Sequence, residues 1–113
     1  MPDSGDIVWL RFDPQARYEQ AGHRPALVLS PAIYNDPTSL MLCCPITTHV
    51  KGYPFEVMIE GDGKAVVLAD QVKSLDWRVR QAKYKGKVTQ EVLSEVRRKA
   101  VVLIGNLSIA RAQ

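Results

Sequence analysis

Short apolar runs separated by turn residues dominate most of the chain. The run at residues 5–12 (Gly-Asp-Ile-Val-Trp-Leu-Arg-Phe) is rich in β-forming residues and ends at the turn pair Asp13-Pro14. Pro25 opens a second run at residues 26–30, which Pro31 and a turn at Asn35-Asp36-Pro37 close. A third run at residues 40–46 is predicted to lie centrally in a sheet.

Further strands are predicted between residues 55 and 88. Residues 55–60 partly alternate apolar and acidic side chains, as a half-exposed strand does. Gly61-Asp62-Gly63-Lys64 is a strong hairpin signal, with residues 65–69 as the return strand. Residues 70–75 continue extended or turn over, and residues 80–88 supply one more strand, which carries basic side chains.

Only the last segment shows clear helical periodicity. Thr89 is a good N-cap with Glu91 in the first turn, and Gly105-Asn106 is a reasonable stop. Apolar residues recur between them at helical spacing: Val92, Leu93, Val96, Ala100, Leu103 and Ile104. Several short strands followed by one helix predict a mainly β fold, a small antiparallel barrel with a C-terminal helix. At 113 residues, we expect one domain over residues 1–113.

Positive charge is concentrated in the second half of the chain. Residues 1–50 hold 3 Lys or Arg against 5 Asp or Glu, whereas residues 51–113 hold 12 against 7. Between Trp77 and Lys87 there are five basic residues and no acidic one. Such a segment suits RNA, DNA or an acidic protein tail. It is also typical of a solvated sheet edge, where lysines prevent pairing between edges.

Several protein classes are disfavoured by what the sequence lacks. It contains no P-loop, G-x-G-x-x-G or H-E-x-x-H motif. No apolar run reaches the ~18 residues of a membrane span, and the acidic, polar start at residues 1–6 is unlike a secretory signal. Cys43 and Cys44 are adjacent on a predicted strand and so point to opposite faces. We therefore expect a cytoplasmic protein without membrane association, metal or cofactor, and with two buried thiols.

Two polar loops flank the predicted central strands and hold the candidate chemistry. The first contains Glu19, Gln20, His23 and Arg24, and the second, at residues 47–54, begins with Thr47. If strands 26–30 and 40–46 pair antiparallel, the start of one lies beside the end of the other. We therefore predict that Arg24 and Thr47 are close together.

This set of side chains suits RNA cleavage without a cofactor, because RNA carries its own nucleophile, the 2′-hydroxyl. Arg24 would stabilise charge on the phosphoryl oxygens, and Thr47 would donate a hydrogen bond to one of them. An arginine is a poor proton donor, with a pKa above ~12, so Glu19 or His23 would move protons. The alternative is structural: a surface arginine at a strand start, a glutamate paired with a nearby arginine, and a solvated histidine.

The order of these residues resembles the MazF/PemK-type toxins of bacterial toxin–antitoxin systems. The resemblance covers residues 5–105 in several blocks: Gly5–Trp9, Phe12–Pro14, Glu19–Pro31, Tyr34-Asn35, Pro45–Thr48, Lys51–Val57 and Ala69–Arg78. It implies an SH3-like (PemK-like) barrel and a homodimer whose groove binds RNA. It also implies an acidic, MazE-like antitoxin with a disordered tail as the inhibitor. The implied activity is sequence-specific, metal-independent cleavage of single-stranded mRNA that leaves a 2′,3′-cyclic or 3′ phosphate and a 5′-hydroxyl.

Site residues carry over position by position. The family's arginine falls on Arg24, its catalytic threonine on Thr47 and its loop glutamate on Glu19, whereas His23 takes a variable position. Candidate RNA contacts come from the matching blocks and the basic segment: Gln20, Thr48, Lys51, Tyr53, Gln71, Trp77, Arg78 and Arg80. Tyr18, Tyr53 and Trp77 are candidate platforms for base stacking.

One departure and two rival functions accompany the resemblance. Many family members have a glycine shortly before the Glu-Gln pair, where this chain has Gln15-Ala16-Arg17-Tyr18, so the RNA recognition sequence cannot be carried over. A related barrel also serves toxins that bind and poison DNA gyrase, so the fold alone does not decide the activity. The second rival is a nucleic-acid-binding module without turnover. Retention of Arg24 and Thr47 in their motifs favours the nuclease.

Overall fold

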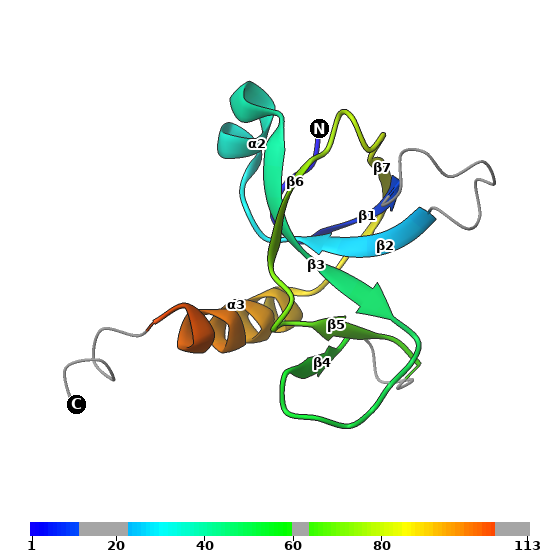
Figure 1. Cartoon of the computed structure of the whole chain (residues 1–113), viewed down its shortest axis with the longest axis vertical. Coiled ribbons are helices and arrows are strands. Elements are labelled where there is room, and N and C mark those ends of the chain that lie inside the picture. Colours follow the sequence, from blue (N-terminus) through cyan, green and yellow to red (C-terminus); the bar gives the residue numbers. More distant parts are fainter. Residues whose placement is uncertain (12–22, 60–63, 106–113) are drawn as a thin grey trace.

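The protein is a curled antiparallel sheet with one long helix packed against it (Figure 1). The computed structural model describes residues 1–11, 23–59 and 64–105. Within them the elements are β1 (Asp6–Arg11), β2 (His23–Val28), α2 (Ala32–Thr38), β3 (Leu40–Thr47), β4 (Glu56–Met58), β5 (Val66–Leu68), β6 (Lys73–Asp76), β7 (Lys83–Lys87) and α3 (Gln90–Ile104). None of the helices in these ranges is long and apolar enough to cross a membrane.

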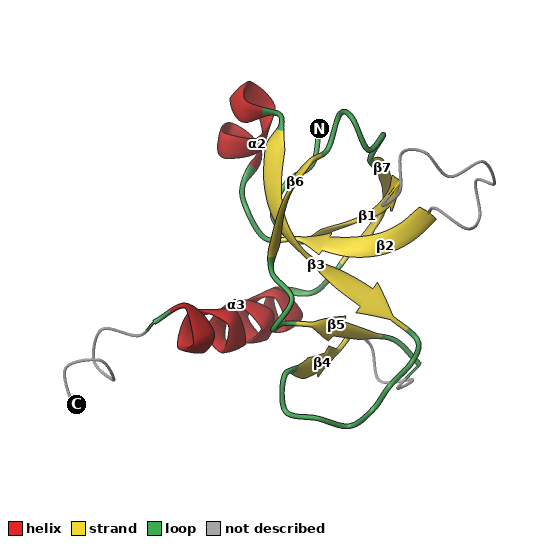
Figure 2. Ribbon diagram, in the orientation of Figure 1, coloured by secondary structure: helices red, strands yellow, loops and turns green. Residues whose placement is uncertain are grey.

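β3 is the central strand, as its continuous apolar run predicts. The strand order is β4-β5-β3-β2-β1-β7, and β6 also pairs with β3. Every pairing among these strands is antiparallel. The first half of β3 pairs with β6 and its last two residues pair with β5, so the sheet bends along this strand (Figure 2). The mainly β, SH3-like antiparallel barrel with a C-terminal helix is confirmed.

The core forms on both faces of the central strands. Val8, Leu10, Val28 and Met41 pack in one cluster, together with Cys43. The opposite face carries a second cluster, which contains Leu27, Cys44, Ile46, Val57, Val67, Leu93 and Val96. The two cysteines therefore point to opposite faces as predicted, because side chains alternate along a strand. Burial raises the pKa of Cys43 to about 11 and that of Cys44 to about 12.

α3 begins and ends as the sequence predicts. The Thr89 hydroxyl accepts a hydrogen bond from the backbone N–H of Val92 at 3.2 Å, and Gly105 caps the end with a φ of 128°. Leu93, Val96 and Ala100 are buried against the sheet. The apolar residues at the end of the helix are not: Leu103 is 52% exposed and Ile104 is 75% exposed.

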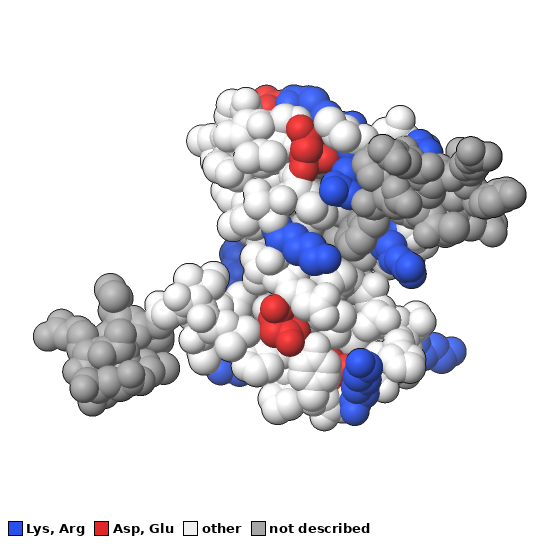
Figure 3. Space-filling view, viewed as in Figure 1, with Lys and Arg blue, Asp and Glu red and all other residues white. Residues whose placement is uncertain are grey.

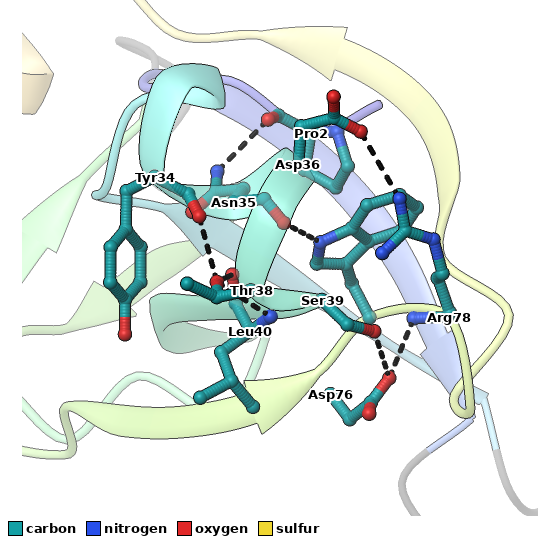
Figure 4. A network of polar contacts seen from close by, with 10 residues as sticks. Pro2, Tyr34, Asn35, Asp36, Thr38, Ser39, Leu40, Asp76 and Arg78 are labelled. Atoms are coloured by element: carbon teal, nitrogen blue, oxygen red, sulfur yellow. Dashed lines mark hydrogen bonds and ion pairs between the residues drawn. The ribbon is translucent and has the colours of Figure 1, made fainter.

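The turn predicted at Asn35-Asp36-Pro37 is instead the short helix α2, so that prediction is wrong. Asn35 is fully buried, and its amide donates to the carbonyl of Pro2 at 2.9 Å (Figure 4) and to that of Ser30 at 2.9 Å. The Ser30 hydroxyl donates to the Asn35 side-chain oxygen at 2.6 Å. These bonds stabilise the helix although Pro37 lies inside it. The partners of Asn35 lie outside the helix, so the local sequence pattern does not reveal them.

Candidate RNA-cleaving site

The first residues of β2 and the last residues of β3 line one pocket. Ala26 pairs with Pro45 across the two strands. The pairing ends there, and Arg24 and Thr47 each lie two residues beyond it. Both residues line the same pocket of about 400 Å³, as antiparallel pairing predicts. The structure thus brings together the two groups that the RNA-cleavage hypothesis needs most.

The pocket is lined by both apolar and cationic side chains. Its lining comprises Ile7, Trp9, His23, Arg24, Pro25, Ile46, Thr47, Thr48, Ile59, Ala65 and Lys85. Two of these side chains carry permanent positive charge, Arg24 and Lys85, and none of them is a carboxylate. Arg24 is exposed, and its side chain makes no hydrogen bond or ion pair with any other residue that the structure describes. Its guanidinium is therefore available to an anion that enters the pocket.

Thr47 presents its hydroxyl as a donor. The hydroxyl oxygen accepts a hydrogen bond from the backbone N–H of His49 at 3.0 Å, which fixes one of its lone pairs. A hydroxyl has one proton to donate, and this arrangement leaves that proton for another acceptor. Thr47 is only half-buried, so a phosphoryl oxygen in the pocket has access to it.

A second, smaller hollow of about 170 Å³ adjoins the first at Thr47. It is lined by Thr47, His49, Lys51, Tyr53, Glu56, Leu68 and Gln71. Three of the predicted RNA contacts, Lys51, Tyr53 and Gln71, therefore lie next to the candidate catalytic threonine. Thr47 is the residue that the linings of the two hollows share.

The loop that borders this second hollow is held in place by Glu56. The Glu56 carboxylate accepts hydrogen bonds from the backbone N–H groups of Lys51 and Gly52, both at 2.8 Å. Gly52 has a φ of 86°, a left-handed conformation that favours glycine. The Lys99 ammonium of α3 donates to the carbonyl of Pro54, which ties the same loop to the helix.

The Tyr53 hydroxyl donates to a carboxylate oxygen of Asp70 at 2.9 Å. Desolvation and, after it, this hydrogen bond raise the pKa of the phenol above its ordinary value. The Tyr53 ring is thus fixed beside the loop as a neutral group.

Trp77, Arg78 and Arg80 line neither hollow. The indole N–H of Trp77 donates to the carbonyl of Asn35 at 2.8 Å, and its ring packs on the core. Arg78 stacks on Trp77, 4.2 Å from the ring centroid, and pairs with Asp36 at 3.1 Å (Figure 4). Arg80 donates to the carbonyl of Arg11 at 3.2 Å. The structure gives these three residues a role in joining the β6–β7 turn to the rest of the fold.

Basic side chains do not form one continuous patch on the face seen in Figure 3, where they are scattered among uncharged residues. Of the basic segment from Arg78 to Lys87, Lys85 alone lines the Arg24 pocket. The predicted site residues Glu19 and Gln20, and the candidate platform Tyr18, lie outside the described residues. In the described part of the chain, His, Cys, Asp and Glu form no group of three that could hold a metal ion.

Sequence reasoning did not assign Trp9 and Lys85 to the site. Val8 and Leu10 are buried, so the alternation of β1 places Trp9 on the opposite face together with Ile7. That signal was available in the sequence. The position of Lys85 depends on how β7 pairs with β1, which the sequence pattern does not reveal.

Comparisons with known proteins agree with this geometry. Residues 3–104 match the PemK-like, MazF-like toxin family of type II toxin–antitoxin systems. The chain is 55% identical over 106 residues to the endoribonuclease toxin MazF of Escherichia coli K12, covering 93% of this chain and 96% of that protein. It is 40% identical over 109 residues to the endoribonuclease toxin ChpB of the same strain, covering 88% and 93%.

Solved structures extend the likeness to the fold. A MazE–MazF crystal structure from Deinococcus radiodurans superposes with a TM-score of 0.83 at 53% identity, covering 92% of this chain and 96% of the other. The family match spans nearly the whole chain and includes Arg24 and Thr47. The chain therefore belongs to the PemK-like, MazF-like toxin family of type II toxin–antitoxin systems.

Proposed function

We propose that this MazF-like endoribonuclease toxin cuts single-stranded mRNA by using the RNA's own 2′-hydroxyl as the nucleophile, without a metal ion. The observation that carries the proposal is the shared pocket of Arg24 and Thr47. It supports a reaction in which a phosphodiester is held between a permanent cation and a hydroxyl donor.

The reaction needs one bond to form and one to break. The 2′-oxygen attacks the adjacent phosphorus, and the bond from phosphorus to the 5′-oxygen breaks. The 2′-hydroxyl proton goes to a base, and the departing 5′-oxygen receives a proton. The products are a 2′,3′-cyclic phosphate, which water opens to a 3′ phosphate, and a 5′-hydroxyl.

Each pocket residue has a role in that reaction. Arg24 stabilises the charge that builds on the phosphoryl oxygens, and Thr47 donates its free proton to one of them. His23 lines the same pocket and is a candidate for the proton transfers. Glu19 is the second candidate, on the family resemblance. Sequence-specific cleavage then depends on side chains along the two hollows, with Lys51, Tyr53 and Gln71 beside Thr47.

The partners follow from the family and from the surface. The Deinococcus radiodurans structure contains MazE with MazF. We expect an acidic, MazE-like antitoxin here, which the basic second half of the chain would attract. We also expect a homodimer, because four successive apolar residues of α3, Val101 to Ile104, are exposed in the single chain. Since mRNA is the substrate, the site of action is the cytoplasm.

The test is cleavage of a long single-stranded RNA by the purified protein in EDTA, followed by mapping of the RNA ends. The proposal predicts discrete fragments with 5′-hydroxyl termini. Intact RNA together with stalled gyrase–DNA complexes would instead indicate a gyrase poison. A mobility shift of RNA without cutting would indicate a binding module, and either result would overturn the proposal.

A further inference from the structure

Lys85 lies at an irregular position on β7, the strand at one edge of the sheet. Ile7 of β1 pairs with Gly86, but the next residue, Val8, pairs with Tyr84. Lys85 is therefore the extra residue of a β-bulge and has no pairing partner on β1. A bulge turns its extra side chain away from the regular alternation, and bulges are frequent beside active sites. The position of Lys85 is set by this bulge.

Lys85 is one of the residues that line the pocket shared by Arg24 and Thr47. Its nitrogen lies 4.4 Å from the centroid of the Trp9 ring, and both residues line the pocket. The ring attracts the cation without neutralising it. Within the described ranges Lys85 has no carboxylate partner, whereas Lys87 on the same strand pairs with Asp6 at 3.3 Å. The charge of Lys85 is therefore available to an anion.

Arg24 and Lys85 line the pocket from different strands, β2 and β7. β1, which carries Trp9, runs between β2 and β7. The two outer strands are thus separated by two strand spacings, roughly 10 Å. Arg24 and Thr47 act together at the β2–β3 side, so the second cation is placed for a different phosphate of the same strand.

We propose that Lys85 binds a backbone phosphate next to the scissile one, with its ammonium held against the Trp9 ring. This inference rests on the proposed function, because it takes RNA as the ligand. A lysine acts as a point charge and suits a contact that positions a phosphate without reading a base. Lys85 is then a substrate-binding residue that sets the register of the strand relative to Arg24 and Thr47.

The alternative is that Lys85 only protects an exposed sheet edge, a role that any lysine of β7 would fill. Lys83 is the matched control, because it is an exposed lysine of the same strand and lines neither hollow. The variants are Lys85→Ala, Lys85→Arg and Lys83→Ala. Thermal melting of each variant checks that it is folded.

The measurement is the affinity for an RNA that contains the mapped cleavage site with a 2′-deoxy substitution at the reacting nucleotide. Fluorescence anisotropy is followed over a series of KCl concentrations. For Lys85→Ala we expect the slope of log affinity against log salt to fall in magnitude by about 0.7, the value for one lost phosphate contact on a single strand. Affinity at moderate salt should fall about tenfold, as for one charge-assisted hydrogen bond. Lys85→Arg should keep the slope.

An unchanged slope in Lys85→Ala, or the same change in Lys83→Ala, would overturn the inference. Cleavage of natural RNA by the same wild-type preparation is scored separately. If wild type cuts RNA and the slope does not move, the inference fails and the proposed function stands. If wild type does not cut RNA, the proposed function fails whatever the slope.

Discussion

Removing the Thr47 hydroxyl tests whether that group acts in catalysis or only stabilises the fold, because the two roles predict different effects on cleavage rate and on stability. Thr47→Val keeps the shape of the side chain and deletes the oxygen that accepts from the His49 N–H at 3.0 Å. His49 is exposed, so water replaces the lost partner, and the loss of stability should be about 1 kcal/mol. That lowers the melting temperature by about 4–8 °C and leaves the protein folded at 25 °C.

The expected effect on cleavage is much larger. If the hydroxyl donates to a phosphoryl oxygen in the transition state, its loss should slow cleavage about 10²–10³-fold, or about 3–4 kcal/mol. Thr47→Ser keeps the donor and should remain active. The assay is single-turnover cleavage of a short RNA with one mapped site at saturating enzyme, so that binding does not limit the rate. The reasoning is refuted if Thr47→Val cleaves at the wild-type rate, or if Thr47→Ser is as slow as Thr47→Val.

Three further predictions concern the fold. Asn35→Ala removes the donor to the carbonyls of Pro2 and Ser30 and the acceptor of the Ser30 hydroxyl proton, and urea titration should show a loss of stability of about 3 kcal/mol. Hydrogen bonds from the Val79 N–H and the Ser39 hydroxyl lower the pKa of Asp76 below 3.8. The contribution of the Asp76 carboxylate to stability is therefore present above pH 3.8 and is lost as the pH falls through the lower pKa of the folded state. The difference in urea midpoint between wild type and Asp76→Asn should shrink as the pH is lowered below 3.8. Because burial raises the pKa values of Cys43 and Cys44 to about 11 and 12, a thiol reagent at neutral pH should label neither in the folded protein and both after unfolding.

The fold could be predicted where local pattern and burial agree. β3 and α3 carry their signals within their own residues: a continuous apolar run in one, and a cap with helical spacing in the other. α2 could not be predicted, because its stability depends on contacts of Asn35 with Pro2 and Ser30. Pro37, one residue before the end of α2, also argued for a turn.

Some features of the candidate site could likewise be predicted from the sequence, and others could not. The proximity of Arg24 and Thr47 followed from the pairing of two predicted strands, which antiparallel geometry fixes. The separation of Arg78 and Arg80 from the pocket did not follow, because charge along a sequence does not say which way a turn faces. Lys85 reaches the pocket through a bulge in the β1–β7 register, and such a shift leaves no signature in composition or charge.

The cleavage rate of Arg24→Ala tests the central claim most directly. Arg24 is exposed and its side chain makes no hydrogen bond or ion pair within the described part of the chain, so the variant should melt at the wild-type temperature. On an RNA with one mapped site, its single-turnover rate should be at least about 10²-fold lower than that of wild type. A folded Arg24→Ala protein that cuts this RNA at the wild-type rate would contradict the assignment of the active site.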